Sequence, residues 1–309
     1  MIEIKNLSKQ YGAVHALDGL NMTVEPGTVF GFLGPNGAGK TTTLRILGGL
    51  ARPTSGTTEV AGVNPAMDGR RLSSVIGFLP EEPSFYPWMT PPEFLDYLGR
   101  LHGLPTPQRT ARIKELLKLV DLAEVRKRRI GGFSRGMRQR LGLAAALLHK
   151  PEVLLLDEPV SALDPAGRKE MLDLIESLRG GCTVLMSSHI LADVERVCSV
   201  VGIITRGRMI VQADRETLMS RYAQPVFLCE GLDSAAIARW AGILQSLSWV
   251  SALAQDRTTL RVTTSDPEFA RLALLRSALA EEVPLRRFEE ARPSLEDIFL
   301  QLVEKEVTA

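Results

Sequence analysis

A glycine-rich motif, Gly-Pro-Asn-Gly-Ala-Gly-Lys-Thr, occupies residues 34–41 and matches the spacing GxxxxGK followed by Ser or Thr. Glycines at these positions let the backbone curl so that several N–H groups point at one phosphate cluster. The Lys40 ammonium is placed to reach the β- and γ-phosphates of a nucleotide, and the Thr41 hydroxyl is placed to ligate Mg²⁺. A glycine-rich turn without function is the alternative interpretation. The residues predicted to contact the nucleotide are Gly34, Pro35, Asn36, Gly37, Ala38, Gly39, Lys40, Thr41 and Thr42.

Two neighbouring acidic residues close the apolar run VLLLDEP, which spans Val153–Pro159. Asp157 ends a predicted buried strand, where a carboxylate is costly unless it meets a cation. We therefore expect Asp157 to hold Mg²⁺ through a water molecule. Glu158 is placed to polarise an attacking water as a general base. An acidic cap at the end of a strand is the alternative, and the two motifs together are typical of any P-loop ATPase.

A third motif, Phe133-Ser-Arg-Gly-Met137, narrows the class of ATPase. It is followed by the helical run RQRLGLAAALL and precedes the acidic strand by about twenty residues. In this order the chain resembles the ATP-binding-cassette (ABC) family, whose LSGGQ signature belongs at this place. Three more elements resemble family motifs: Ser161–Asp164 the D-loop, His189 the switch histidine, and Tyr11 the aromatic residue that stacks on adenine. The resemblance covers roughly residues 1–220.

The resemblance implies roles for these residues in ATP hydrolysis. Ser134 also heads a predicted helix, so its hydroxyl and the nearby N–H groups form an anion site. Because the phosphate loop already supplies one anion site, a second one makes sense only if another subunit presents it. In the family, two cassettes bind head-to-tail, with ATP between the phosphate loop of one and the signature of the other. By resemblance Tyr11, Ser134, Gly136 and Asp164 contact ATP, and His189 contacts the γ-phosphate and orients the water.

The sequence departs from the family pattern at two places. Arg135 and Met137 replace the Gly and Gln of LSGGQ. Ser134 and Gly136, the positions of close approach, are kept, so ATPase activity is expected to survive. Glu81 stands where the family has a glutamine; it still offers oxygen to Mg²⁺ but adds a negative charge beside the acidic pair. In Glu81 and in FSRGMRQR the chain looks like the cassettes of drug, sodium or polysaccharide exporters with separately encoded membrane subunits. The C-terminal PSLEDIFLQLV, at Pro293–Val303, is similar to the end of that branch.

The first two-thirds of the chain alternate predicted strands with helices, which favours an α/β fold with a largely parallel core sheet. The short apolar runs VLLLD and TVLMSS are typical of strands buried on both faces. The resemblance further implies a P-loop NTPase of ABC type with an antiparallel N-terminal subdomain and a helical subdomain. The predicted strands are Ile2–Leu7, Val14–Val24, Thr28–Leu33, Ser74–Leu79, Val153–Asp157, Thr183–Ser187, Ser199–Thr205 and Met209–Gln212. The predicted helices are Lys40–Leu50, Pro92–Leu101, Gln108–Val120, Arg135–His149, Pro165–Leu178 and Ile190–Val197.

After about Tyr222 the pattern changes to a βαββαβ order followed by a helix, which predicts a small ferredoxin-like α+β module. We therefore expect an ABC nucleotide-binding domain at residues 1–221 and an accessory domain at residues 222–309. The alternative is that these elements extend the first domain. The predicted strands are Pro225–Cys229, Val250–Ala254, Thr259–Val262 and Val283–Phe288, and the predicted helices are Ser234–Leu244, Pro267–Leu279 and Leu295–Val303.

Composition sets further bounds on function. The 309 residues are 45% hydrophobic, which excludes an intrinsically disordered chain. With 37 basic and 36 acidic residues the net charge is +1, so no nucleic-acid partner is expected, and the basic run Arg126–Arg129 is interpreted as a solvated loop. The chain has 3 cysteines, and none of them is in CxxC spacing. Its start carries no apolar signal core, and no apolar run reaches about 18 residues. These observations predict a soluble, cytoplasmic chain. The resemblance implies a peripheral location on the inner face of the cell membrane.

Together these observations predict the ATPase subunit of an ABC exporter. Two copies, or this chain and a paralogous cassette, are expected to close on two MgATP, and integral membrane permease subunits are expected to move the substrate. The aromatic run Phe85–Trp88 is interpreted as a groove for a helix of the membrane subunit, with ordinary packing as the alternative.

Two competing classes are weighed against the exporter. A non-transport ABC protein is disfavoured. Members that act in translation usually carry two cassettes in one chain, and this chain has one set of motifs. Members that act in DNA repair separate the phosphate loop from the signature by a long coiled coil, whereas here about ninety residues without heptads separate Thr41 from Phe133. A small-molecule P-loop kinase would leave the signature, Ser161–Asp164 and His189 unexplained.

Overall fold

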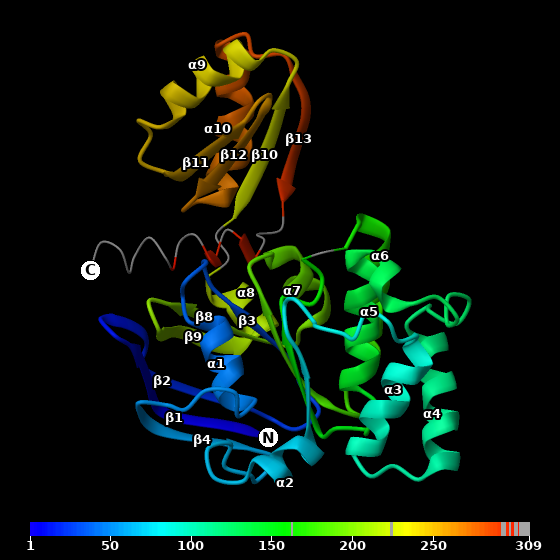
Figure 1. Cartoon of the computed structure of the whole chain (residues 1–309). Coiled ribbons are helices and arrows are strands. Elements are labelled where there is room, and N and C mark those ends of the chain that lie inside the picture. Colours follow the sequence, from blue (N-terminus) through cyan, green and yellow to red (C-terminus); the bar gives the residue numbers. More distant parts are fainter. Residues whose placement is uncertain (162, 223–224, 292–294, 297, 300–301, 303–309) are drawn as a thin grey trace. The chain divides into compact units, whose positions relative to one another are not determined.

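The computed structural model describes residues 1–161, 163–222, 225–291, 295–296, 298–299 and 302. The chain divides into two compact units, Met1–Arg215 and Glu216–Ala309, whereas the sequence places the boundary after residue 221. In Figure 1 the first unit runs from blue to yellow-green and the second from yellow to red. Among the described residues, no helix has the length and apolar character needed to cross a membrane.

A six-stranded sheet forms the centre of the first unit, in the order β5-β6-β7-β3-β8-β9. Every neighbouring pair is parallel except β8 and β9. All residues of β3, β6 and β7 are buried, as expected for apolar strands covered on both faces. The mainly parallel α/β fold is thereby confirmed. The strands are β3 (Val29–Leu33), β5 (Ile76–Leu79), β6 (Val153–Asp157), β7 (Thr183–Ser188), β8 (Val200–Thr205) and β9 (Arg208–Asp214).

The first unit contains a second sheet, which is antiparallel and has three strands in the order β2-β1-β4. Its strands are β1 (Ile2–Tyr11), β2 (Val14–Val24) and β4 (Ser55–Val60). Apolar side chains of this sheet share one core with β3 and with helix α1 (Lys40–Leu47), including Leu20, Phe30 and Leu44. The sequence analysis missed β4, because SGTTEV carries few apolar residues and its strand form depends on pairing with β1.

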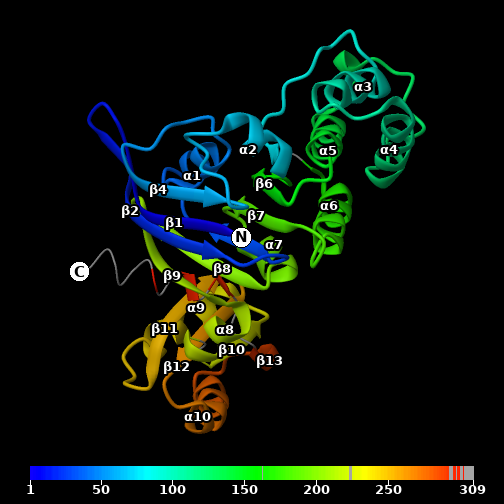
Figure 2. The same cartoon turned by 90° about the horizontal axis from the view of Figure 1, so that it is seen from below.

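Three helices form a helical subdomain on one side of the first unit, as Figure 1 and Figure 2 show: α3 (Pro91–Leu101), α4 (Thr106–Leu119) and α5 (Arg135–Ala146). The predicted strand Ser74–Leu79 is wrong at its start, because α2 continues to Val75 before β5 begins. Asp68 caps that helix by accepting a hydrogen bond from the Arg71 N–H. The remaining helices of the unit are α1 (Lys40–Leu47), α2 (Gly69–Val75), η1 (Ile130–Gly132), α6 (Pro165–Ser177) and α7 (Leu191–Val197).

The second unit contains an antiparallel sheet in the order β11-β12-β10-β13, which with two helices follows the βαββαβ order and confirms the small α+β module. Apolar residues of the sheet and both helices form its core, among them Phe227, Trp240 and Leu274. Helix α8 (Arg215–Tyr222) was not predicted, and the predicted last helix extends into residues outside the described ones. The other elements are β10 (Val226–Gly231), α9 (Ser234–Leu244), β11 (Val250–Asp256), β12 (Thr259–Thr264), α10 (Pro267–Ala280) and β13 (Leu285–Ala291).

Candidate nucleotide-binding site

The glycine-rich loop connects the buried strand β3 to α1, which begins at Lys40. Gly39 has φ +110°, and a Cβ there would lie 2.7 Å from the Ala16 carbonyl oxygen, so only glycine fits this turn. The Lys40 ammonium donates hydrogen bonds to the carbonyl oxygens of Gly34, at 2.7 Å, and Pro35, at 3.3 Å. The loop therefore holds the lysine over its own backbone at the start of the helix.

Lys40 lies beside an acidic group at the end of β6. Its Nζ is 3.8 Å from Glu158 Oε1, and both side chains are largely buried. Burial lowers the pKa of Lys40, and the negative charges of Glu158, Asp157 and Glu81 oppose this shift. The proximity of these carboxylates favours the charged lysine that phosphate binding requires.

Hydroxyl groups connect Asp157 to the phosphate loop and to the neighbouring strand. The Thr41 hydroxyl donates to Asp157 Oδ1 at 3.1 Å, and the Ser187 hydroxyl on β7 donates to the same oxygen at 2.7 Å. The Glu158 N–H in turn donates to the Ser187 hydroxyl oxygen at 3.0 Å. Sequence reasoning missed Ser187, although a polar residue near the end of an apolar strand, two positions before a histidine, is a usable signal.

The oxygens of Thr41 and Asp157 suit a magnesium ion. Mg²⁺ is usually held by one or two carboxylates together with substrate phosphates, and it prefers oxygen ligands. Among the described residues there is no group of three or more His, Cys, Asp or Glu side chains arranged for a metal. The oxygens of Thr41 and Asp157 are a donor set that fits a magnesium ion bound together with the phosphates of a nucleotide.

Glu158 and His189 contact each other across the ends of β6 and β7. His189 Nδ1 lies 2.8 Å from Glu158 Oε2, and the imidazole is 47% exposed. Glu158 has φ +49°, a left-handed conformation that is uncommon for a residue with a side chain and often marks functional positions. The carboxylate thus has a polar neighbour on each side, Lys40 and His189.

A pocket of about 380 Å³ brings most of these groups together. It is lined by the loop residues 36–42 and by Glu81, Glu158 and His189, as well as by Val14 and Ala16 of β2, which the sequence did not single out. Tyr11 is not among its lining residues; its exposed ring instead lies under the Lys9 ammonium, 4.6 Å from the ring centroid.

The signature and the D-loop line a second pocket, of about 610 Å³, which shares no described residue with the first. Ser134 caps α5 by accepting a hydrogen bond from the Met137 N–H at 3.2 Å, and Asp164 caps α6 by accepting one from the Gly167 N–H at 3.1 Å. A Cβ on Gly136 would lie 3.0 Å from Leu163 Cδ2, so the signature and the D-loop are in contact. Ser134, Gly136 and Asp164 are therefore together, but apart from the phosphate loop.

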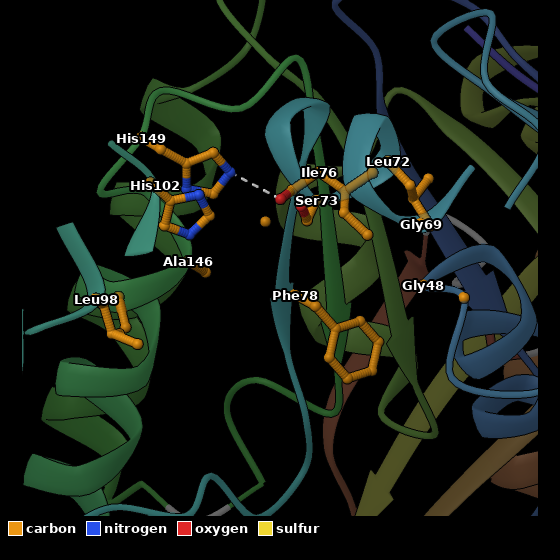
Figure 3. A pocket seen from close by; sticks show the side chains of 13 residues that line it. Gly48, Gly69, Leu72, Ser73, Ile76, Phe78, Leu98, His102, Ala146 and His149 are labelled. Atoms are coloured by element: carbon orange, nitrogen blue, oxygen red, sulfur yellow. Dashed lines mark hydrogen bonds between the residues drawn. The ribbon is translucent and has the colours of Figure 1, made fainter. Parts of the chain in front are cut away.

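A third pocket, of about 340 Å³, lies where β5 and α2 meet the helical subdomain (Figure 3). His102 and His149 stack at its edge with ring centroids 4.0 Å apart, and His149 Nε2 lies 2.8 Å from the Ile76 carbonyl oxygen. Burial lowers the pKa of both histidines. This pair was not predicted, because the two histidines are far apart in the chain and in no ligand spacing.

The fold and the phosphate loop define a P-loop nucleotide-binding protein whose signature residues line a separate pocket. A family model described as ABC transporter matches residues 17–161, and one described as ATP-binding protein DrrA1-3-like, C-terminal domain, matches residues 214–303. The chain is 41% identical over 303 residues to the uncharacterized ABC transporter ATP-binding protein YxlF of Bacillus subtilis, covering 98% of this chain and 99% of the relative. The chain belongs to the ATP-binding proteins of ABC transporters.

Other similar proteins include a resistance protein and a cassette dimer. The daunorubicin resistance ATP-binding protein DrrA3 of Streptomyces coeruleorubidus is 37% identical over 311 residues, covering 97% of this chain and 95% of the relative. A solved dimeric structure of the ATP-binding cassette MJ0796, in a post-hydrolysis state with ADP and Pi, matches with a TM-score of 0.64 at 25% identity, over 69% of this chain and 98% of that one.

Proposed function

We propose that this chain binds and hydrolyses ATP as the nucleotide-binding subunit of an ABC exporter, in a head-to-tail pair that encloses two MgATP. The observation that carries the proposal is the division of the site between two pockets. The phosphate loop lines one pocket, and Ser134, Gly136 and Asp164 line another with which it shares no described residue. A second subunit that supplies the signature side completes each site.

Each group has a task in this proposal. Lys40 and the loop N–H groups bind the phosphates. The oxygens of Thr41, Asp157 and Glu81 hold Mg²⁺, which neutralises phosphate charge when it is bound. Glu158 accepts the proton of the attacking water, and His189, 2.8 Å from it, positions the γ-phosphate and that water.

The names of relatives support the direction of transport. The relative from Streptomyces coeruleorubidus is a daunorubicin resistance protein, and a relative from Bacillus subtilis that is 33% identical over 308 residues is a linearmycin resistance protein. Resistance to a toxic compound is consistent with its removal from the cell, so export is the proposed direction. The proposed location is the inner face of the cell membrane, on separately encoded permease subunits.

An exposed aromatic cluster in and before α3 is the proposed contact with the permease. Trp88 is 61% exposed, and its ring centroid lies 5.3 Å from that of Tyr86, which lies 5.8 Å from that of Tyr97. Aromatic side chains that remain exposed beside one another are typical of protein interfaces.

Mixing two inactive variants tests the divided site. Lys40→Ala and Ser134→Arg each damage both sites of a homodimer, but a mixed dimer contains one site with an intact loop and an intact signature. An equal mixture is expected to recover about a quarter of the parental ATPase rate if the two sites act independently. A mixture no more active than the separate variants would contradict the head-to-tail pairing.

Trp88→Ala tests the permease contact. The variant is expected to keep the ATPase activity of the purified chain, because Trp88 lines neither nucleotide pocket, and to lose co-purification with the proposed permease subunit. Leu119→Ala, an exposed apolar residue at the end of α4, is the control. Unchanged co-purification of the Trp88→Ala variant would rule out this surface.

A further inference from the structure

Helix α10 of the second unit is apolar on two faces. Ala270, Leu274 and Ala278 are buried in the core of the unit. Four large apolar side chains are exposed on the other side, by the following fractions: Phe269 55%, Leu272 59%, Leu275 41% and Leu279 81%. With a helical period of 3.6 residues these four lie within an arc of about 120°. We call them the α10 stripe.

Two opposite charges lie within the same arc. Glu268 and Arg276 stand four residues before and after Leu272, so each is about one helical turn from it. The ring of Phe269 contacts that of Trp249 edge-on, with centroids 5.7 Å apart, which restricts its position. The stripe is therefore an ordered apolar surface with an acidic end and a basic end.

We propose that the α10 stripe is the contact between the second units of two copies of this chain, with the two α10 helices antiparallel about a two-fold axis near Leu272. In that arrangement Glu268 of one copy lies level with Arg276 of the other, twice, because a two-fold contact repeats each pair. A parallel arrangement would bring like charges level with one another. The inference rests on the proposed function only in that the head-to-tail pair supplies the second copy.

The apolar area of the α10 stripe limits the affinity of this contact. Four side chains expose on the order of a few hundred Å² of apolar surface, whereas a stable interface takes about 800 Å² from each partner. The stripe alone is therefore too small to hold a dimer at ordinary concentrations. Within a pair already joined by MgATP the effective concentration of the second copy is roughly millimolar, so that a weak contact forms.

Crosslinking through a single introduced thiol tests the contact. The native Cys182, Cys198 and Cys229 are buried, so Leu272→Cys places an exposed thiol at the proposed axis. A disulfide needs Cα atoms about 4.4–6.8 Å apart, a distance that facing helices reach only at the axis. Mild oxidation with MgATP is expected to give a covalent dimer. Leu232→Cys, 69% exposed in the same unit but outside α10, is the matched control and is expected to form no covalent dimer.

Leu279→Cys tests the orientation of the two helices. In the antiparallel pair the two copies of position 279 are about 21 Å apart along the axis, since each is seven residues from the centre at 1.5 Å per residue. Little covalent dimer is expected. A Leu272→Cys yield no higher than that of Leu232→Cys would overturn the contact, and a Leu279→Cys yield equal to that of Leu272→Cys would overturn the antiparallel arrangement.

Two further measurements separate this inference from the proposed function. Glu158→Gln with MgATP is expected to form a dimer, which reports the head-to-tail pair without any change in α10. Adding Leu272→Glu, which places two like charges at the axis, is expected to weaken that dimer about tenfold, and Leu232→Glu is expected to leave it unchanged. Failure of Glu158→Gln to dimerise would count against the proposed function; equal dimer affinity with and without Leu272→Glu would count against the α10 contact.

Discussion

Replacing Glu158 with Gln separates ATP binding from hydrolysis, because this carboxylate takes part in both the charge balance and the proposed chemistry. Lys40 Nζ lies 3.8 Å from Glu158 Oε1. Two unit charges at that distance attract by about 4 kcal/mol at an effective dielectric constant of 20. In the protein without nucleotide the substitution removes this attraction and lowers the pKa of Lys40 further. In the Glu158→Gln variant, the phosphates of bound ATP take the place of the carboxylate as the partner of Lys40. They also no longer experience repulsion from a negative charge at residue 158.

ATP affinity of Glu158→Gln is therefore expected to equal or exceed that of the parent. Hydrolysis loses its proposed general base, a loss that typically slows the reaction by about 10²–10⁴-fold, or about 3–5 kcal/mol of barrier. Bound ATP then persists, and the chain is expected to elute as a dimer in size-exclusion chromatography with MgATP.

The assay is phosphate release in a single turnover, together with ATP affinity measured by equilibrium binding. Glu115→Gln makes the same chemical change at an exposed carboxylate on α4, 2.6 Å from Arg112, and is expected to behave like the parent. Hydrolysis by Glu158→Gln at the parental rate would refute the role of the carboxylate. A large loss of ATP affinity would refute the charge argument.

Three other changes test further parts of the protein. Lys40→Ala is expected to abolish ATPase activity with folding retained, as measured by phosphate release and thermal melting, and unchanged turnover would reject the phosphate-loop assignment. Glu81→Gln is expected to keep the ATPase rate in saturating Mg²⁺ within about tenfold, about 1.4 kcal/mol, and to weaken its dependence on Mg²⁺ concentration; an unchanged dependence would mean that Glu81 does not contact the metal. Burial lowers the pKa of His102 and His149, so the unfolded chain binds more protons near pH 6 than the folded chain does. The free energy of unfolding is therefore expected to fall as the pH drops below about 6.5. His102→Gln is expected to reduce that fall, as measured by melting curves between about pH 7.5 and about pH 5.5.

The sequence predicted those parts of the fold and site whose pattern is local. The phosphate loop follows the short apolar strand β3, and Asp157 and Glu158 stand at the end of the short apolar strand β6, so their type and order suffice to place them at the carboxyl ends of parallel strands. Element ends were less accurate where a cap decided them: α1 ends at Leu47 with Gly48 as its C-cap, before the predicted end at Leu50.

What the sequence could not predict depends on contacts between distant segments. Strand β4 exists because it pairs with β1, with Ile2 opposite Val60. The hydroxyl of Ser187 becomes meaningful only when β6 and β7 lie side by side. The stack of His102 on His149 similarly requires the ends of α3 and α5 to meet, which no spacing in the chain encodes.

The separation of the phosphate loop from the signature has a consequence for where the cell's ATP is hydrolysed. A lone subunit carries two incomplete halves, so its hydrolysis rate depends on how often it meets a counterpart. A freely diffusing copy at low concentration rarely does, whereas two copies held side by side on one transporter meet at roughly millimolar effective concentration. Under the proposed head-to-tail pairing, ATP is thus hydrolysed mainly by assembled transporters, and dilute unassembled subunits hydrolyse little of it without any separate inhibitor.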